Sequence, residues 1–377
     1  MGTYYRQTWA EVSLDAIAHN YMQFRQALPA EVRIMAVVKA NAYGHGAIEV
    51  AKEALRCGAG YLGVASLDEA IPLREAGIQA PILVLGYTAP DAVDAAAEHD
   101  VTLTVYSEDV LRAVSAGFDR HRKPIKLHIK LDTGMGRIGI VGEQEAIAFI
   151  DLAMHTPGAQ VEGLFTHYAC ADQIDKAYTL EQHRRFERVI AHYREQGFVF
   201  PYAYAGNSAI GIDIPELAGN MLRLGISLYG LYPSAEVNRE QMYLRPAMTF
   251  KTKVSMVKVL PPGSGVSYGA TYRTAGEETI ATLPVGYGDG YTRLLTGKAE
   301  ALIHGVRVPV VGRICMDQCM IHVSNVPDVR VGDEVVLFGR QGEHELSADE
   351  LADRLGTINY EITCMVNARV PRVFVRD

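Results

Sequence analysis

Lys39 stands at the end of an apolar run, in the segment RIMAVVKANAYGHG that covers residues 33–46. A lysine ammonium in a low-dielectric setting loses affinity for its proton, and the neutral amine is a nucleophile. Such an amine can form a Schiff base with a carbonyl cofactor, while the glycines and Tyr43 would let backbone and hydroxyl groups approach an anion. Residue type alone favours a simpler role, a strand-end lysine whose charged tip reaches solvent. The rest of the sequence must decide between these roles.

Further residues that could do chemistry follow other apolar runs. Arg137 lies in KLDTGMGRIG, His167 lies in FTHYA, and Asn207 with Ser208 follows FPYAYAG. Arg223 interrupts the apolar segment MLRLGISLYG, where an always-charged guanidinium needs an acceptor. A buried salt bridge would explain Arg223 by itself, so its meaning depends on where the elements of the fold place it.

The elements around these residues alternate in type from residue 33 onwards. Apolar runs such as RIMAVV, PILVLG, VTLTVY and IKLHIKL are separated by amphipathic stretches such as GAIEVAKEALRCG and LEQHRRFERVIAHYREQG. Continuously apolar strands are covered on both faces, as in a parallel sheet. About eight such units predict an α/β fold with an N-terminal (β/α)8 barrel of the TIM type. An open doubly wound sheet is the alternative.

The sequence pattern changes after Pro246. Segments such as TFKTKVSMVKVL, RVPVVGRI and DEVVLFG read as short strands split by Gly and Pro turns, with little helical periodicity before SADELADRLG. The 377 residues are enough for two domains, and the 49% apolar content supports a sizeable core. We therefore expect a barrel domain over residues 1–245 and a mainly β domain over residues 246–377.

Composition excludes several classes of function. The formal charge of −8 and the interspersed charged residues give no reason to expect a nucleic-acid partner. The N-terminus lacks a signal-peptide pattern and no apolar stretch approaches the roughly 18 residues of a membrane span, so we expect no membrane partner and a cytoplasmic location. The five scattered cysteines indicate neither a disulfide framework nor a zinc site, and no metal is expected.

In a barrel of this type, chemistry takes place at the carboxyl ends of the strands. The polar groups expected there are Lys39, Arg137, His167, Asn207 and Ser208. The loops after the seventh and eighth strands usually bind phosphate, which predicts that Ser208, Gly225 and Ile226 hold a phosphate group. A Schiff-base lysine, a phosphate cradle and a charged partner for a ring nitrogen, Arg223, together describe a site for pyridoxal phosphate.

The motifs VVKANAYGHG, HIKLDTGMGRIG, MLRLGISLYG, SYGATYR and RICMDQ, with the Asn207 and Ser208 loop, resemble those of the bacterial alanine racemases. The resemblance spans the chain from TWAEVSLDAIAHN to NARVPRV. It implies a barrel followed by a β domain on which the first residues dock, pyridoxal 5'-phosphate on Lys39, and a homodimer with shared active sites. It also implies interconversion of L-alanine and D-alanine, which supplies D-alanine for cell-wall peptidoglycan.

Racemisation removes the α proton from one face of the substrate and returns a proton to the other, which suits two bases better than one. The resemblance places Lys39 on one face and Tyr268 of SYGATYR, from the second subunit, on the other. Tyrosine has an ordinary pKa near 10, so as a base it needs its phenolate stabilised. The resemblance gives His167 as hydrogen-bond partner of that hydroxyl, with Arg223 beyond it.

Arg137 and Lys130 take related roles from the resemblance. Arg137 matches a residue that contacts the phenolic oxygen of the cofactor and the carboxylate side of the substrate. Lys130 matches a lysine that is carbamylated in many members of the family, which turns an ammonium into an anion that can orient Arg137.

The resemblance assigns the remaining residues to the substrate carboxylate, to the cofactor phosphate and to the path by which substrate reaches the site. Met316 and Asp317 of ICMDQ match a segment whose Met316 backbone amide meets the substrate carboxylate. Tyr43 and Tyr360 match phosphate-binding tyrosines. Tyr287 of VGYGDGY, together with Tyr360, resembles a pair that narrows the path to the site and so favours a small side chain.

Three other functions compete with this interpretation. A non-catalytic protein that handles pyridoxal phosphate could be a lone barrel with the same lysine, but it would lack the β domain and Tyr268. A basic amino acid decarboxylase of barrel-plus-β design is a second choice, against which SYGATYR and the surroundings of Arg223 argue. A racemase for serine or for a broader set of amino acids is the closest rival.

Overall fold

The computed structural model describes residues 5–121 and 123–376. These residues form two compact units. The barrel unit contains the described residues 16–42, 47–121 and 123–245, and the β unit contains residues 5–15, 43–46 and 246–376. Residues 43–46, which follow the first barrel strand in the chain, thus belong to the β unit.

Within the described residues, the barrel unit is built on one parallel sheet of eight strands. Its strands are β2 (Arg33–Val37), β3 (Tyr61–Val64), β4 (Ile82–Val84), β5 (Thr102–Val105), β6 (Ile125–Lys130), β7 (Ala159–Phe165), β8 (Tyr202–Tyr204) and β9 (Met221–Leu224). The strands follow chain order from β2 to β8, and β9 pairs with β2.

Hydrogen bonds join the two edges of this sheet and close it. The amide of Asn220 donates to the carbonyl of Ala203 over 3.0 Å, and the amide of Arg223 donates to the carbonyl of Gly206 over 3.1 Å. The expected (β/α)8 barrel is confirmed, and the open sheet is not what forms.

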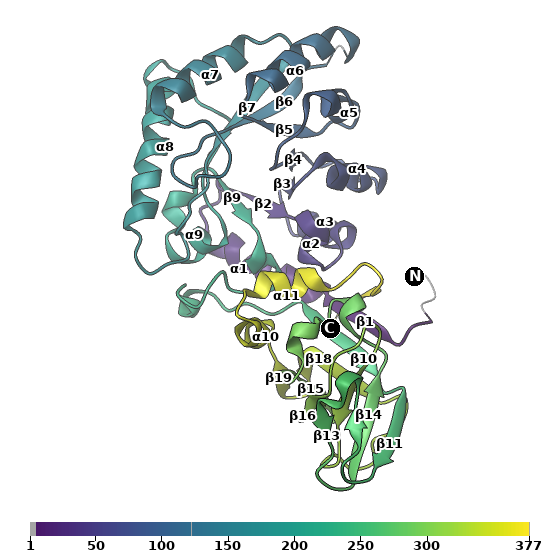
Figure 1. Ribbon diagram of the computed structural model, residues 1–377. Coiled ribbons are helices and arrows are strands. Elements are labelled where there is room, and N and C mark those ends of the chain that lie inside the picture. The colour runs from purple at the N-terminus through teal and green to yellow at the C-terminus, as the bar shows by residue number, and fades with distance from the viewer. Residues whose placement is uncertain (1–4, 122, 377) are drawn as a thin grey trace. The chain divides into compact units, whose positions relative to one another are not determined.

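Helices lie outside the strands of the barrel, as Figure 1 shows for α3 to α6. The helices of this unit are α1 (Leu14–Ala27), α3 (Ala47–Arg56), α4 (Leu67–Glu75), α5 (Val93–Glu98), α6 (Glu108–His121), α7 (Glu143–His155), α8 (Ala177–Glu195) and α9 (Ser208–Asp213), with short 3-10 turns η1 (Pro90–Ala92), η2 (Pro215–Ala218), η3 (Ile226–Tyr229) and η4 (Arg239–Gln241). Their amphipathic pattern explains their position. In α3, for example, Val50, Ala51 and Ala54 recur at helical spacing and are buried.

Side chains from several strands fill the barrel interior. This core cluster consists of Met35, Tyr61, Leu83, Phe165, Tyr204 and Met221. The interior is therefore packed rather than open, and ligands must bind at the ends of the strands.

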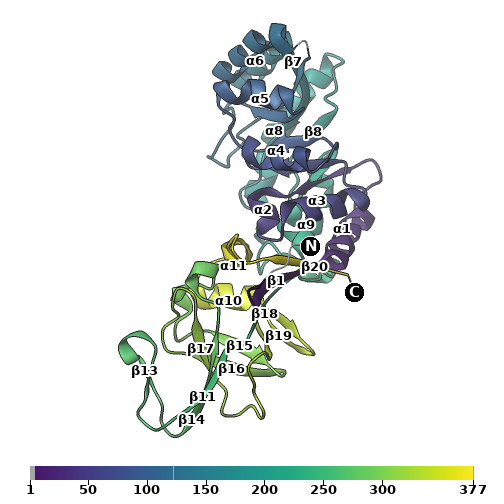
Figure 2. The ribbon, with the colours of Figure 1, turned by 90° about the vertical axis from the view of Figure 1, so that its right-hand side faces the viewer.

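The β unit is dominated by one mostly antiparallel sheet. Its strands are β1 (Thr8–Ser13), β10 (Met248–Lys253), β11 (Met256–Leu260), β14 (Glu278–Leu283), β15 (Glu300–Ile303), β16 (Val306–Val311), β17 (Cys319–His322), β18 (Glu334–Gln341), β19 (His344–Leu346) and β20 (Arg372–Val375), and a separate pair is formed by β12 (Gly265–Val266) and β13 (Tyr272–Arg273). The N-terminal strand β1 lies between β10 and β20, and it is parallel only to β20. In Figure 2, β11, β13 and β14 lie at the end of this unit away from β1 and β20.

Two helices and three 3-10 turns complete the described part of the β unit. They are α10 (Ala348–Leu355), α11 (Asn359–Met365), η5 (Tyr268–Ala270), η6 (Tyr287–Asp289) and η7 (Arg293–Leu295). The segment SADELADRLG forms α10, whose first turn is capped by the side chain of Ser347 and whose end is the left-handed Gly356. The helix α11 is too short to show a clear helical period in the sequence. No helix in the described ranges has the length and apolar character needed to cross a membrane.

Candidate active site

A left-handed turn follows the first barrel strand. β2 ends at Val37, and the four residues after Lys39 all have φ between 52° and 54°. Non-glycine residues adopt this conformation at a cost of roughly 1–2 kcal/mol each, so contacts must hold the turn. Glu69 accepts a hydrogen bond from the amide of Ala40 over 2.7 Å, and the side chain of Asn41 accepts one from the amide of Ala47 over 2.9 Å. The backbone next to Lys39 is thus fixed by its neighbours.

The loop that carries Arg137 is organised by one carboxylate. Asp132 accepts hydrogen bonds from the amides of Gly134, Gly136 and Arg137, over 2.9 to 3.1 Å. Burial alone would raise the pKa of Asp132, but the hydrogen bonds from the amides outweigh burial and lower it. The Arg137 side chain is exposed at the carboxyl end of the barrel strands.

Lys130 is the last residue of β6 and is 3% exposed. Its ammonium nitrogen donates to the carbonyl of Leu131 over 2.7 Å. Burial lowers the pKa of Lys130 to about 7, and the positive charge of Arg223 lowers it further. Near neutral pH a large share of this amine is therefore uncharged.

Arg223, on β9, is 5% exposed. Its guanidinium contacts the residues that directly follow β7 and β8. One terminal nitrogen, Nη2, donates to the carbonyls of Thr166 and Ala205 and to Nδ1 of His167, all over 2.9 to 3.0 Å. The other, Nη1, is buried and has no hydrogen-bond partner among the described residues. An unpaired buried donor is costly, so this nitrogen is a place where a ligand acceptor would bind.

The contact with Arg223 fixes the state of His167. An arginine only donates hydrogen bonds, so Nδ1 of His167 must accept, and the ring proton lies on Nε2. Burial lowers the pKa of His167 well below its usual value, and the charges of Arg223 and Arg137 lower it further. His167 is therefore neutral, with its ring proton on Nε2.

The predicted phosphate-binding residues come together at one turn. Asn207 caps α9 by accepting from the amide of Ile210 over 3.1 Å. The hydroxyl of Ser208 accepts from the amide of Gly225 over 3.0 Å. β9 ends at Leu224, and η3 begins at Ile226, so MLRLGISLYG is only partly a strand. The break turns the amides of Gly225 and Ser227 toward the hydroxyl of Ser208, at the carboxyl end of the barrel.

In the β unit, Tyr43 and Tyr360 lie together, with ring centroids 6.0 Å apart. Tyr43 is buried, and this burial raises its pKa, as does the neighbouring Tyr360. Arg372 holds the segment 43–46, because its Nε donates to the carbonyl of Gly44 over 2.8 Å. Gly44 is required at this point, because a Cβ there would lie 2.1 Å from the carbonyl oxygen of Thr363.

Tyr268 lies on the exposed surface of the β unit, with 71% of its area accessible. It begins η5, directly after Ser267, which has a φ of 64°. The hydroxyl of Ser267 donates to the carbonyl of Arg313 over 2.6 Å and so holds this strained turn. A cavity of about 790 Å³ adjoins it and is lined by residues that include Tyr268, Cys315, Met316 and Asp317.

The motifs VGYGDGY and ICMDQ pack backbone against backbone. The amide of Tyr287 donates to the carbonyl of Cys315 over 3.0 Å, and the amide of Gly288 donates to the carbonyl of Met316 over 2.9 Å. A Cβ at Gly286 would lie 2.2 Å from the carbonyl oxygen of Cys315, so only glycine allows this approach.

The site residues named from the sequence fall into two groups, one in each unit. The barrel unit brings together Lys39, Lys130, Arg137, His167, Asn207, Ser208, Arg223, Gly225 and Ile226 at the carboxyl ends of its strands. The β unit carries Tyr43, Tyr268, Tyr287, Met316, Asp317 and Tyr360.

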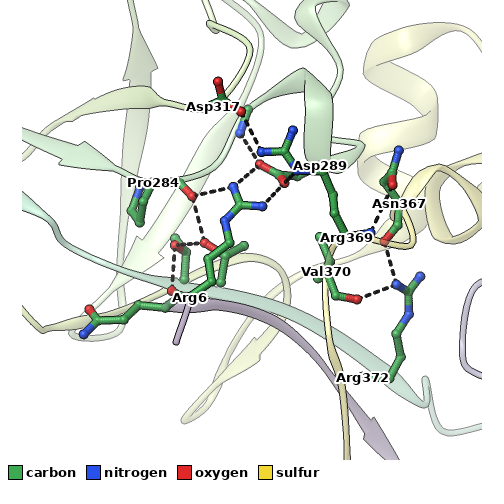
Figure 3. Close-up of polar contacts among 12 residues, drawn as sticks. Arg6, Pro284, Asp289, Asp317, Asn367, Arg369, Val370 and Arg372 are labelled. Atoms are coloured by element: carbon green, nitrogen blue, oxygen red, sulfur yellow. Dashed lines mark hydrogen bonds and ion pairs between the residues drawn. The ribbon is translucent and has the colours of Figure 1, made fainter. Parts of the chain in front are cut away.

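The ion pairs of Asp289, in the β unit that carries this second group, were not predicted from the sequence. Asp289 is fully buried and is bound by both Arg6 and Arg369 (Figure 3). An aspartate in a glycine-rich turn reads as a solvated residue, and the arginines are far from it in the chain. The sequence feature that could have indicated Arg369 is the motif NARVPRV, which contains Arg369 and Arg372.

Two protein-family models match this chain. The model described as alanine racemase, N-terminal domain, covers residues 12–233, and the model described as alanine racemase, C-terminal domain, covers residues 247–374. An alanine racemase of Desulfovibrio desulfuricans is 48% identical over 375 residues, which is 100% of each chain. The solved alanine racemase of Clostridium difficile 630 is 41% identical with a TM-score of 0.96, over 100% of this chain and 97% of that one. A histidine racemase from Leuconostoc mesenteroides is 31% identical with a TM-score of 0.92, over 99% of both chains.

Proposed function

This chain belongs to the alanine racemase family, and we propose that it interconverts L-alanine and D-alanine with pyridoxal 5'-phosphate bound at Lys39. The observation that carries this proposal is the pair formed by Arg223 and His167, a buried cation and a neutral imidazole beside the strand ends. We further propose a cytoplasmic homodimer with shared active sites, whose product serves peptidoglycan synthesis.

The residues of the barrel fit this cofactor. The unpaired Nη1 of Arg223 is a donor for the single acceptor that a pyridine nitrogen offers. Ser208, Gly225 and Ile226 lie at the turn after β9, where the hydroxyl of Ser208 and the backbone amides are suited to a phosphate group. When bound, pyridoxal phosphate supplies an electron-withdrawing ring that acidifies the α C–H bond of the attached amino acid.

The proton is moved by side chains of the protein. Lys39 is the base on one face of the substrate, and Tyr268 of the second subunit is the base on the other. The Nε2 proton of the neutral His167 can donate to the Tyr268 oxygen, which stabilises the phenolate. Arg223 keeps this tautomer in place because it occupies Nδ1 as a donor.

The carboxylate end of the substrate is held by positively charged and amide groups. We propose that Arg137 and the amide of Met316 bind the substrate carboxylate, with Asp317 beside them. Tyr287 and Tyr360 narrow the path to the site and favour a small side chain. A histidine racemase shares this fold, so the fold alone does not determine the substrate.

The test of the function is to incubate the purified protein with each enantiomer of alanine, serine and lysine and to follow chirality, with and without added cofactor. Inversion of alanine ahead of serine and lysine is expected. Faster inversion of serine or lysine would replace the substrate proposed here. Cofactor retention without inversion of any amino acid would favour a non-catalytic binding protein.

Replacing Arg223 with Glu is expected to raise the ratio of transamination to racemisation by roughly tenfold or more. The guanidinium does not release its proton, so it leaves the ring nitrogen unprotonated, whereas a glutamic acid would share a proton with it. The ratio is measured as pyruvate formed per inversion. Arg223→Lys keeps a cation and is the matched control. An equal ratio in the Glu and Lys variants would contradict this role.

Lys130 is expected to carry a carbamate. Its pKa of about 7 leaves the amine free to attack CO2, which forms an N–C bond and releases a proton. The resulting anion would lie near Arg137 and orient it. Protein incubated with 13C-bicarbonate is expected to give a carbamate carbon signal in NMR spectra, absent from the Lys130→Ala variant. A signal of equal intensity in both proteins, or none in either, would contradict the modification.

A further inference from the structure

Asp289 is the buried centre of an ion network in the β unit. Its side chain is fully inaccessible to solvent and receives a fork of hydrogen bonds from the guanidinium of Arg6, one of them over 2.6 Å. Nε of Arg369 lies 3.1 Å from the same carboxylate. Two cations therefore compensate one buried anion, as burial of a carboxylate requires.

Arg369 makes a second contact that Arg6 does not make. Its Nη2 donates to Oδ1 of Asp317 over 2.6 Å, and the Asp317 side chain is 58% exposed (Figure 3). The pairs with Asp317 and Asp289 raise the pKa of Arg369 further above its ordinary value. Arg369 thus connects a buried anchor to an exposed carboxylate next to Met316.

The turn that contains Asp289 packs closely against Arg369. Asp289 accepts from the amide of Gly286 over 3.0 Å, and its own carbonyl accepts from the amide of Asn367 over 2.9 Å. A Cβ at Gly288 would lie 2.6 Å from Nη1 of Arg369. The guanidinium therefore lies directly against the loop that bears Tyr287.

We propose that Arg369, anchored on Asp289, is a positioning residue that neutralises Asp317 and holds its carboxylate away from the carboxylate of the substrate. This inference rests on the proposed function, in which the amide of Met316 binds that substrate group. Without Arg369, the negative charge of Asp317 would face an anion of like sign next to Met316. The loss would appear in substrate binding more than in proton transfer.

Arg369→Gln is expected to raise the KM for both enantiomers of alanine roughly tenfold and to change kcat little. The double variant Arg369→Gln with Asp317→Asn is expected to recover much of this loss, because the uncompensated charge is then absent. A merely structural role would instead lower the melting temperature of both variants and leave the KM for alanine unchanged.

Arg6→Gln is the matched control, since it removes the other partner of Asp289 without touching Asp317. It is expected to lower the melting temperature while the KM for alanine stays unchanged. If Arg369→Gln does not fold, Arg369→Lys retains a cation that cannot bridge both carboxylates, and an intermediate KM is expected.

The outcomes separate this inference from the function on which it rests. A wild-type protein that does not invert alanine overturns both. A wild-type protein that inverts alanine, together with an unchanged KM in the Arg369 variants, overturns the positioning role alone. A rise in KM of equal size in the Arg6 and Arg369 variants, or no recovery in the double variant, also overturns it.

Discussion

Tyr268→Phe is expected to slow racemisation by about 10²- to 10⁴-fold while the protein keeps its lysine-bound cofactor. The change removes only the hydroxyl that we assign as one of two bases. Tyr268 is largely exposed in its own chain, so the substitution leaves the packing of the β unit intact. Lys39→Ala is expected to lose the absorbance of the lysine-bound cofactor as well, because that change removes the amine itself.

Exchange of the substrate α proton with deuterated solvent tests the two bases separately, because each base removes the proton from one enantiomer. With both bases present, each enantiomer is expected to exchange. With Tyr268→Phe, the base on one face remains, so exchange is expected for one enantiomer only, without inversion.

Tyr272→Phe is a control for loss of a hydroxyl close to η5. The Tyr272 hydroxyl donates to Glu278 over 2.7 Å, and we assign it no part in proton transfer. Its racemisation rate is expected to equal that of the wild type. Full racemisation by the Tyr268 variant would show that one base is sufficient and would contradict the two-base assignment.

Much of the barrel could be predicted from sequence because its signals are local. Continuous apolar runs separated by amphipathic stretches determine parallel strands with outer helices, and the barrel rule then places Lys39, His167 and Arg223 at one end. The strand content after Pro246 was equally visible. The least accurate part was MLRLGISLYG, where the break after Leu224 is set by tertiary contacts rather than by composition.

Two features of the candidate site could not be predicted in this way. The left-handed turn after Lys39 contains residues that ordinarily avoid positive φ, and it exists because Glu69 and Asn41 bind its backbone. The pair of Arg6 and Asp289 joins residues 283 positions apart, a contact set by strand order in the folded sheet. Neither feature leaves a periodic pattern in the sequence.

Mixing Lys39→Ala protomers with Tyr268→Phe protomers is expected to restore activity to two proteins that are each nearly inactive. In a symmetric dimer with shared sites, a hybrid has one site with both changes and one site with neither. Random exchange of equal amounts makes about half of the dimers hybrids, so about a quarter of wild-type activity is expected. Differently tagged protomers, purified as hybrids by two affinity steps, would give about half of the wild-type activity per dimer.

This experiment tests whether Tyr268 of one chain acts in the active site that contains Lys39 of the other chain. Its control pairs Lys39→Ala with a protomer that carries both substitutions, because that hybrid contains no intact site and no gain is expected. Purified hybrids without activity, formed from protomers that bind cofactor where Lys39 is present, would place both bases on the same chain. In that case Tyr268 of the β unit and Lys39 of the barrel unit would belong to an active site built from one chain.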